Sequence, residues 1–120
     1  MPRATVSSDT TELDLQTLEG GKVTLKRMAY GKWLERSEMA MKIQFAATKG
    51  SKDTAGNVEM ANKAVTAFEF KNCIVDHNLT GDDDQPLNLA NASTLDLLDP
   101  KVGNEISAKI TEMHEFDLPN

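Results

Sequence analysis

The chain has 120 residues, which is enough for one domain with a hydrophobic core. Its net charge of −6 argues against a nucleic-acid-binding domain. The single cysteine, Cys73, cannot form an internal disulfide, and no apolar run approaches the roughly 20 residues that span a bilayer. These features predict a cytoplasmic protein without a membrane or nucleic-acid partner.

The N-terminal part is predicted to contain a β-hairpin. Residues 1–10 are small and polar, and we expect them to be mobile. From there, Leu13 and Leu15 alternate with polar residues, as do Val23 and Leu25. Alternation on both sides of the Glu19–Gly21 turn indicates two paired strands. Residues 11–116 are predicted to form one domain, followed by a tail over 117–120.

The middle of the chain has the periodicity of two helices. The first is predicted over about 29–47 and the second over about 58–76, with a flexible connection over 49–57. On the second helix, apolar residues including Val65 and Phe68 share one side, and polar residues including Glu69 share the other. The short connection predicts that the two helices pack as an antiparallel pair.

A polar loop over 76–91 and two further helices complete the prediction. Ser93 begins a capping-box variant with Asp96 at the third helical position, so a short helix is expected to carry Leu95, Leu97 and Leu98. Asp99 and Pro100 are typical of the N-cap and first residue of a last helix. Its expected apolar stripe is Val102, Ile106, Ile110 and Met113. The predicted fold class is α+β, an N-terminal hairpin followed by a mainly helical domain with a C-terminal helix.

No constellation of residues supports catalysis or a bound cofactor. Cys73 and His77 would share one face at the end of the second helix, near Asp76, but a metal site needs further ligands and His114 is the only other imidazole. The opening of a calcium loop at Asp76–Gly81 lacks the bidentate glutamate, because Leu87 occupies that position. We therefore expect an inert buried thiol, a helix-capping His77, no metal and no enzymatic activity.

Several residues are candidates for binding a partner protein. Tyr30 and Trp33 lie three residues apart on one helical face, where they either pack in the core or anchor a partner. Methionine side chains adapt to partners of varied shape. The assigned partner-binding residues are Tyr30, Trp33, Met39 and Met41 on the first helix, and Asp76, His77 and Asn78 after the second.

Charge is unevenly distributed along the chain. Residues 22–52 contain eight basic and two acidic residues, whereas 76–100 contain six aspartates and no lysine or arginine. The two stretches either form separate solvated surfaces or dock on one another, within a molecule or between copies. Docking between copies predicts a weak homo-oligomer.

Three stretches together resemble the tail assembly chaperones of long-tailed phages with non-contractile tails. They are Leu13–Leu34, Phe68–Leu79 and Leu98–Ile106, and their order and spacing match that family over about residues 11–114. The resemblance implies a protein of the host bacterial cytoplasm that binds the tape measure protein, a long and largely helical chain. It would keep the tape measure soluble until the tail tube protein polymerises around it. The alternatives are a structural tail or connector subunit retained in the virion, and a small metal-dependent enzyme or sensor.

Overall fold

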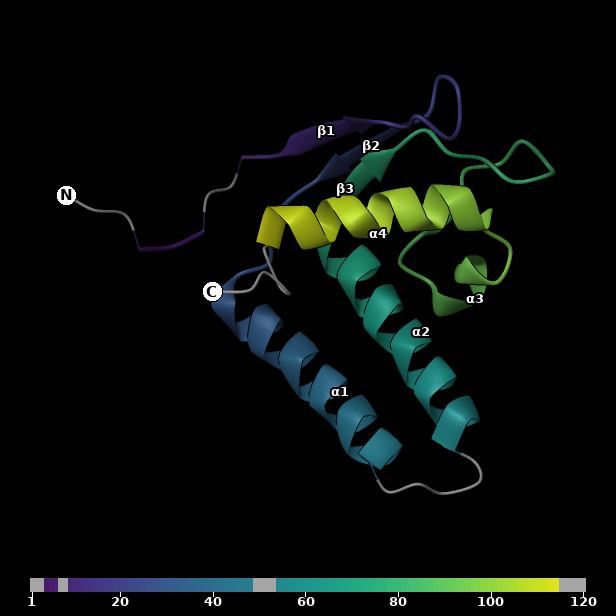
Figure 1. The fold of residues 1–120 in the computed structure, drawn as a ribbon. Helices are drawn as coiled ribbons and strands as arrows, with labels where there is room; N and C mark the ends of the chain where they lie inside the picture. Colours follow the sequence, from purple (N-terminus) through teal and green to yellow (C-terminus); the bar gives the residue numbers. More distant parts are fainter. Residues whose placement is uncertain (1–3, 7–8, 49–53, 115–120) are drawn as a thin grey trace.

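The computed structural model describes residues 4–6, 9–48 and 54–114, with the backbone alone at 43–48 and 54–62. Its element order is β1 (Thr11–Asp14), β2 (Lys22–Leu25), α1 (Tyr30–Thr48), α2 (Thr54–Cys73), β3 (Ile74–His77), α3 (Ala92–Leu95) and α4 (Pro100–His114). The fold is α+β, as predicted (Figure 1). Half of the predicted N-terminal segment 1–10 and all of the predicted tail 117–120 lie outside the described residues.

The predicted hairpin is present. β1 pairs antiparallel with β2, and Leu13 lies opposite Val23. Its turn depends on two glycines: Gly20 has a φ of 81°, and a Cβ on Gly21 would lie 2.8 Å from a Leu15 methyl group. The positive φ of Gly20 strains any residue with a side chain, and a side chain on Gly21 would collide with Leu15.

The two long helices lie side by side and antiparallel, as expected (Figure 1). The predicted flexible connection over 49–57 is wrong at residues 54–57, which belong to α2, while 49–53 lie outside the described residues. Gly56 disfavours a helix by about 1 kcal/mol, and packing between helices readily outweighs such a preference.

A third strand replaces the predicted end of the second helix. α2 ends at Cys73, and Ile74–His77 pairs antiparallel with β2, so that the sheet order is β1-β2-β3. The register shifts between Thr24 and Leu25, which leaves Val75 as the extra residue of a bulge. The β-branched Ile74 and Val75 suit a strand, and the free edge of β2 offers backbone hydrogen bonds.

The C-terminal third matches the prediction at α4 and departs from it at α3. Asp99 caps α4, accepting a hydrogen bond from the Lys101 N–H at 2.9 Å. The N-cap of α3 is Asn91 rather than Ser93, because the Asn91 side chain accepts from the Ser93 N–H. α3 ends at Leu95 with Asp96 as its C-cap, and Leu97 lies beyond it in a turn.

The core lies between the sheet, α4 and the C-terminal end of α2. Val23 and Leu25 point from one face of β2 toward the predicted stripe of α4, which is buried at Val102, Ile106 and Ile110 and partly buried at Met113. α4 crosses beneath the sheet (Figure 1). The remaining buried members of this cluster are Leu15, Met28, Phe70, Cys73, Leu79 and Leu89.

Candidate partner-binding surface

Four large apolar side chains in the described part of α1 are exposed to solvent. Tyr30 is 74% exposed and Met41 is 68% exposed, and Trp33 and Leu34 between them are also exposed. At 100° per residue these four side chains fall on one side of the helix. We call them the α1 stripe. Of the two alternatives for Tyr30 and Trp33, burial in the core is therefore wrong.

The two aromatic rings of the α1 stripe stack on one another. Their centroids lie 6.0 Å apart and their planes differ by 11°. Beside them is a hollow of about 440 Å³, which is also lined by residues 4–6, Arg27, Met28 and His114. Stacked rings are rigid and lose little conformational entropy on contact with a partner, which suits an anchor.

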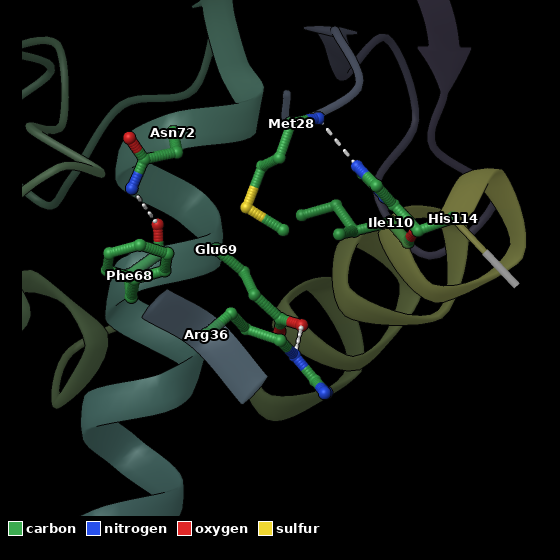
Figure 2. A network of polar contacts seen from close by, with 7 residues as sticks. All are labelled: Met28, Arg36, Phe68, Glu69, Asn72, Ile110 and His114. Atoms are coloured by element: carbon green, nitrogen blue, oxygen red, sulfur yellow. Dashed lines mark hydrogen bonds and ion pairs between the residues drawn. The ribbon is translucent and has the colours of Figure 1, made fainter. Parts of the chain in front are cut away.

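The start of α1 is held in place by α4. The N–H of Met28 donates to Nε2 of His114 at 2.7 Å, and Nδ1 of His114 bonds to the carbonyl of Ile110 at 2.8 Å (Figure 2). Nε2 must be an unprotonated acceptor, so the ring is the neutral tautomer with its proton on Nδ1. Burial lowers the pKa of His114 and favours the same neutral form.

The opposite side of α1 faces α2. Arg36 Nε donates to Oε2 of Glu69 at 3.0 Å (Figure 2). Lys32 Nζ lies 5.9 Å from the centroid of the Phe68 ring. Glu69 was predicted on the polar side of the second helix, yet only 3% of it is exposed. A buried carboxylate requires a partner, which the guanidinium of Arg36 supplies. Met39 is half-buried and lies on this side of α1, away from Met41.

Asp76, His77 and Asn78 do not lie beside the α1 stripe. They lie in and just after β3 opposite the start of β2, whereas α1 follows the other end of β2. Asn78 accepts from the Lys22 N–H and donates to the Gly20 carbonyl, so its side chain secures the hairpin. His77 accepts from the Leu79 N–H and does not cap a helix, which corrects the prediction. Asp76 is exposed.

Cys73 is fully buried, as expected of an inert thiol. Burial raises the pKa of its thiol to about 12, and the Glu69 charge adds to this effect. Cys73 ends α2 and His77 ends β3, so the two do not share a helical face. Within the described ranges, no three histidine, cysteine, aspartate or glutamate residues are grouped so that they could hold a metal ion.

The two charged stretches meet where β2 pairs with β3, but no ion pair between described residues joins one stretch to the other. Among the described residues, the basic side chains of α1 pair with Glu35, Glu69 and Glu38 rather than with an aspartate of 76–100. The acidic stretch instead receives one ion pair from outside 22–52, between Lys63 and Asp96. The weak homo-oligomer stays a prediction.

Sequence reasoning missed two features that the fold brings about. Glu105 of α4 binds the start of the hairpin turn, and Leu97 is 83% exposed. Neither feature has a local signal in the sequence. The Glu105 contact joins residues 88 positions apart, and the exposure of Leu97 depends on where α3 ends.

Comparisons with protein-family models, curated proteins and solved structures find no match. In the parts of the chain that the structure describes, no helix is long and apolar enough to cross a membrane.

Proposed function

We propose that this protein is a tail assembly chaperone that binds the tape measure protein of a long-tailed phage in the host cytoplasm and keeps it soluble. The observation that carries the proposal is the exposed α1 stripe. Large apolar side chains gathered on one exposed helical face mark a protein-interaction surface. The three stretches that resemble the chaperone family support the identity of the partner.

The α1 stripe suits a long helical ligand. Its residues occupy positions 30, 33, 34 and 41 of one helix, close to the spacing by which an amphipathic helix contacts an apolar partner. Tyr30 and Trp33 supply aromatic anchors, and Met41 supplies an adaptable contact farther along. Many weak contacts of this kind add up along one long chain. The tail tube protein would later take the place of these copies.

The proposal is tested by co-expression with the tape measure protein encoded by the same phage, followed by pull-down. The wild-type chain should retain the tape measure. Replacing the anchors together, as Tyr30→Ser with Trp33→Ser, should lower the affinity by more than about 30-fold, since a single aromatic anchor contributes about 2 kcal/mol or more. Val75→Ser is the matched control, because Val75 is 52% exposed and lies on β3. Equal retention by the double variant and the wild type would contradict the proposal.

The protein composition of purified phage particles distinguishes a chaperone from a structural tail or connector subunit. A chaperone is displaced during assembly and should be absent from them. A tail or connector subunit would be present in stoichiometric amount.

A further inference from the structure

A second surface lies at the end of the fold where α4 begins. The hairpin turn, the loop after β3 and the turn between α3 and α4 line a groove of about 780 Å³ there. We call it the acidic groove. Its apolar lining consists of Leu18, Leu79, Pro86, Leu87, Leu97, Leu98 and Val102.

The walls of the acidic groove are held by hydrogen bonds. In the loop after β3, Thr80 bridges to Pro86 and the Leu87 N–H donates to the Leu79 carbonyl at 3.1 Å. On the opposite wall, the Glu105 carboxylate accepts from the N–H groups of Gln16 and Thr17 at 2.8 and 3.0 Å. That contact fixes the hairpin turn against α4, next to Leu18. The groove is thus formed before any ligand arrives.

The lining combines exposed leucines with unneutralised carboxylates. Leu97 is 83% exposed and Leu18 is 44% exposed. Asp82, Asp83 and Asp99 also line the groove, and within the described part of the chain none of the three forms an ion pair. Of the described residues that line the groove, none is a lysine or arginine. A complementary ligand therefore carries apolar groups together with positive charges.

We propose that the acidic groove binds a basic amphipathic segment of another protein. Leucine-like side chains of the segment would cover Leu97 and Leu18, while its lysines or arginines would face the three aspartates. Nucleic acid has the wrong charge for this surface. This proposal is independent of the α1 stripe, and it holds whether or not the tape measure is the partner.

A second copy of this chain is a poorer occupant. The obvious basic element, α1, has Lys32, Arg36 and Lys42 each already paired with a carboxylate in the folded molecule. Because Glu35 and Glu38 lie on the same helix, α1 has three basic and two acidic residues and a net charge of only +1. A separate polypeptide whose cations are free gains more from the aspartates.

The test uses a synthetic 14-residue peptide of leucine and lysine with leucines at helical spacing, titrated into the isotope-labelled protein and followed by amide NMR. Shifts should centre on residues 79–88 and 94–102. A peptide with glutamate in place of each lysine should not bind. Spermidine, which is cationic without apolar side chains, should bind at least tenfold more weakly than the lysine peptide.

Matched variants distinguish peptide binding in the acidic groove from nonspecific attraction of a cationic peptide to an acidic protein. Leu97→Ser should weaken peptide binding about tenfold through lost apolar burial, and Val75→Ser should change it less than twofold. Asp82→Asn with Asp83→Asn should weaken binding about fivefold. Asp14→Asn with Glu112→Gln removes the same charge from exposed sites outside the groove and should have less than a twofold effect.

Four outcomes would overturn the proposal. They are shifts spread evenly over the molecule, equal losses in the two charge variants, binding unaffected by Leu97→Ser, and failure of the lysine peptide to bind. Light scattering completes the test, because self-association abolished by Leu97→Ser would assign the groove to a second copy instead.

Discussion

Replacing Arg36 with methionine should strongly destabilise the fold, because it removes the guanidinium from a buried carboxylate. The Arg36 side chain is 18% exposed and that of Glu69 only 4%, with Nε and Oε2 3.0 Å apart. Methionine preserves much of the packing volume but leaves Glu69 without its charge partner on α1. Breaking a buried pair from one side costs about 3 kcal/mol, a large share of the roughly 5–15 kcal/mol that stabilises a typical domain.

Urea denaturation followed by circular dichroism measures this loss, and the melting temperature should fall by about 10 °C. Adding Glu69→Gln to Arg36→Met should recover part of the loss, since a buried amide is cheaper to desolvate than a carboxylate. Lys42→Met is the matched control: its pair with Glu38 is exposed on both sides, so less than about 0.5 kcal/mol should be lost. A loss below about 1 kcal/mol for Arg36→Met, or no recovery in the double variant, would refute the reasoning.

Three further predictions concern titratable groups. With a thiol pKa of about 12, only about one Cys73 in 10⁵ is a thiolate at pH 7, so Ellman's reagent should label the native protein very slowly and the urea-unfolded protein at once; fast native labelling would contradict burial. The pKa of His114 is lowered mainly by burial from its usual 6.5, so its contribution to stability should be complete above pH 6.5 and decline as the pH falls toward the lowered value. His114→Ala should flatten that part of the urea-midpoint profile, and an unchanged slope would argue against the neutral ring. Hydrogen bonds from the Gln16 and Thr17 N–H groups and the Thr17 hydroxyl lower the pKa of Glu105, so its contribution should be present above pH 4.5 and decline as the pH falls below it. Glu105→Gln should accelerate amide exchange at Gln16 and Thr17, and unchanged exchange there would show that the carboxylate does not secure the turn.

Elements with a strong local signal were predictable from the sequence. The alternation at Val23 and Leu25 predicted a strand of the hairpin, and Asp99 with Pro100 predicted the start of α4. In both cases neighbouring residues determine the structure: side chains alternate along a strand, and a capping carboxylate meets the first free N–H groups of a helix.

Features that depend on distant parts of the chain were not predictable in this way. Ile74 and Val75 continue the apolar pattern of α2, and it is pairing with β2 that makes them a strand. Glu69 is buried because Arg36 approaches from the neighbouring helix. For the α1 stripe, periodicity indicates that Tyr30, Trp33 and Met41 share a face, but only the packing of α1 on α2 determines that this face is exposed.

The proposed role of the α1 stripe is to keep a tape measure protein in solution. Its most direct test is the fraction of tape measure protein that remains in the soluble lysate when the two chains are expressed together. Wild type and Val75→Ser should both keep most of it soluble, whereas Tyr30→Ser with Trp33→Ser should leave it in the pellet while itself remaining folded and soluble. The proposed role would be contradicted if the tape measure protein were equally soluble with the wild type, Val75→Ser and the double variant. It would also be contradicted if the tape measure protein were insoluble even with the wild type.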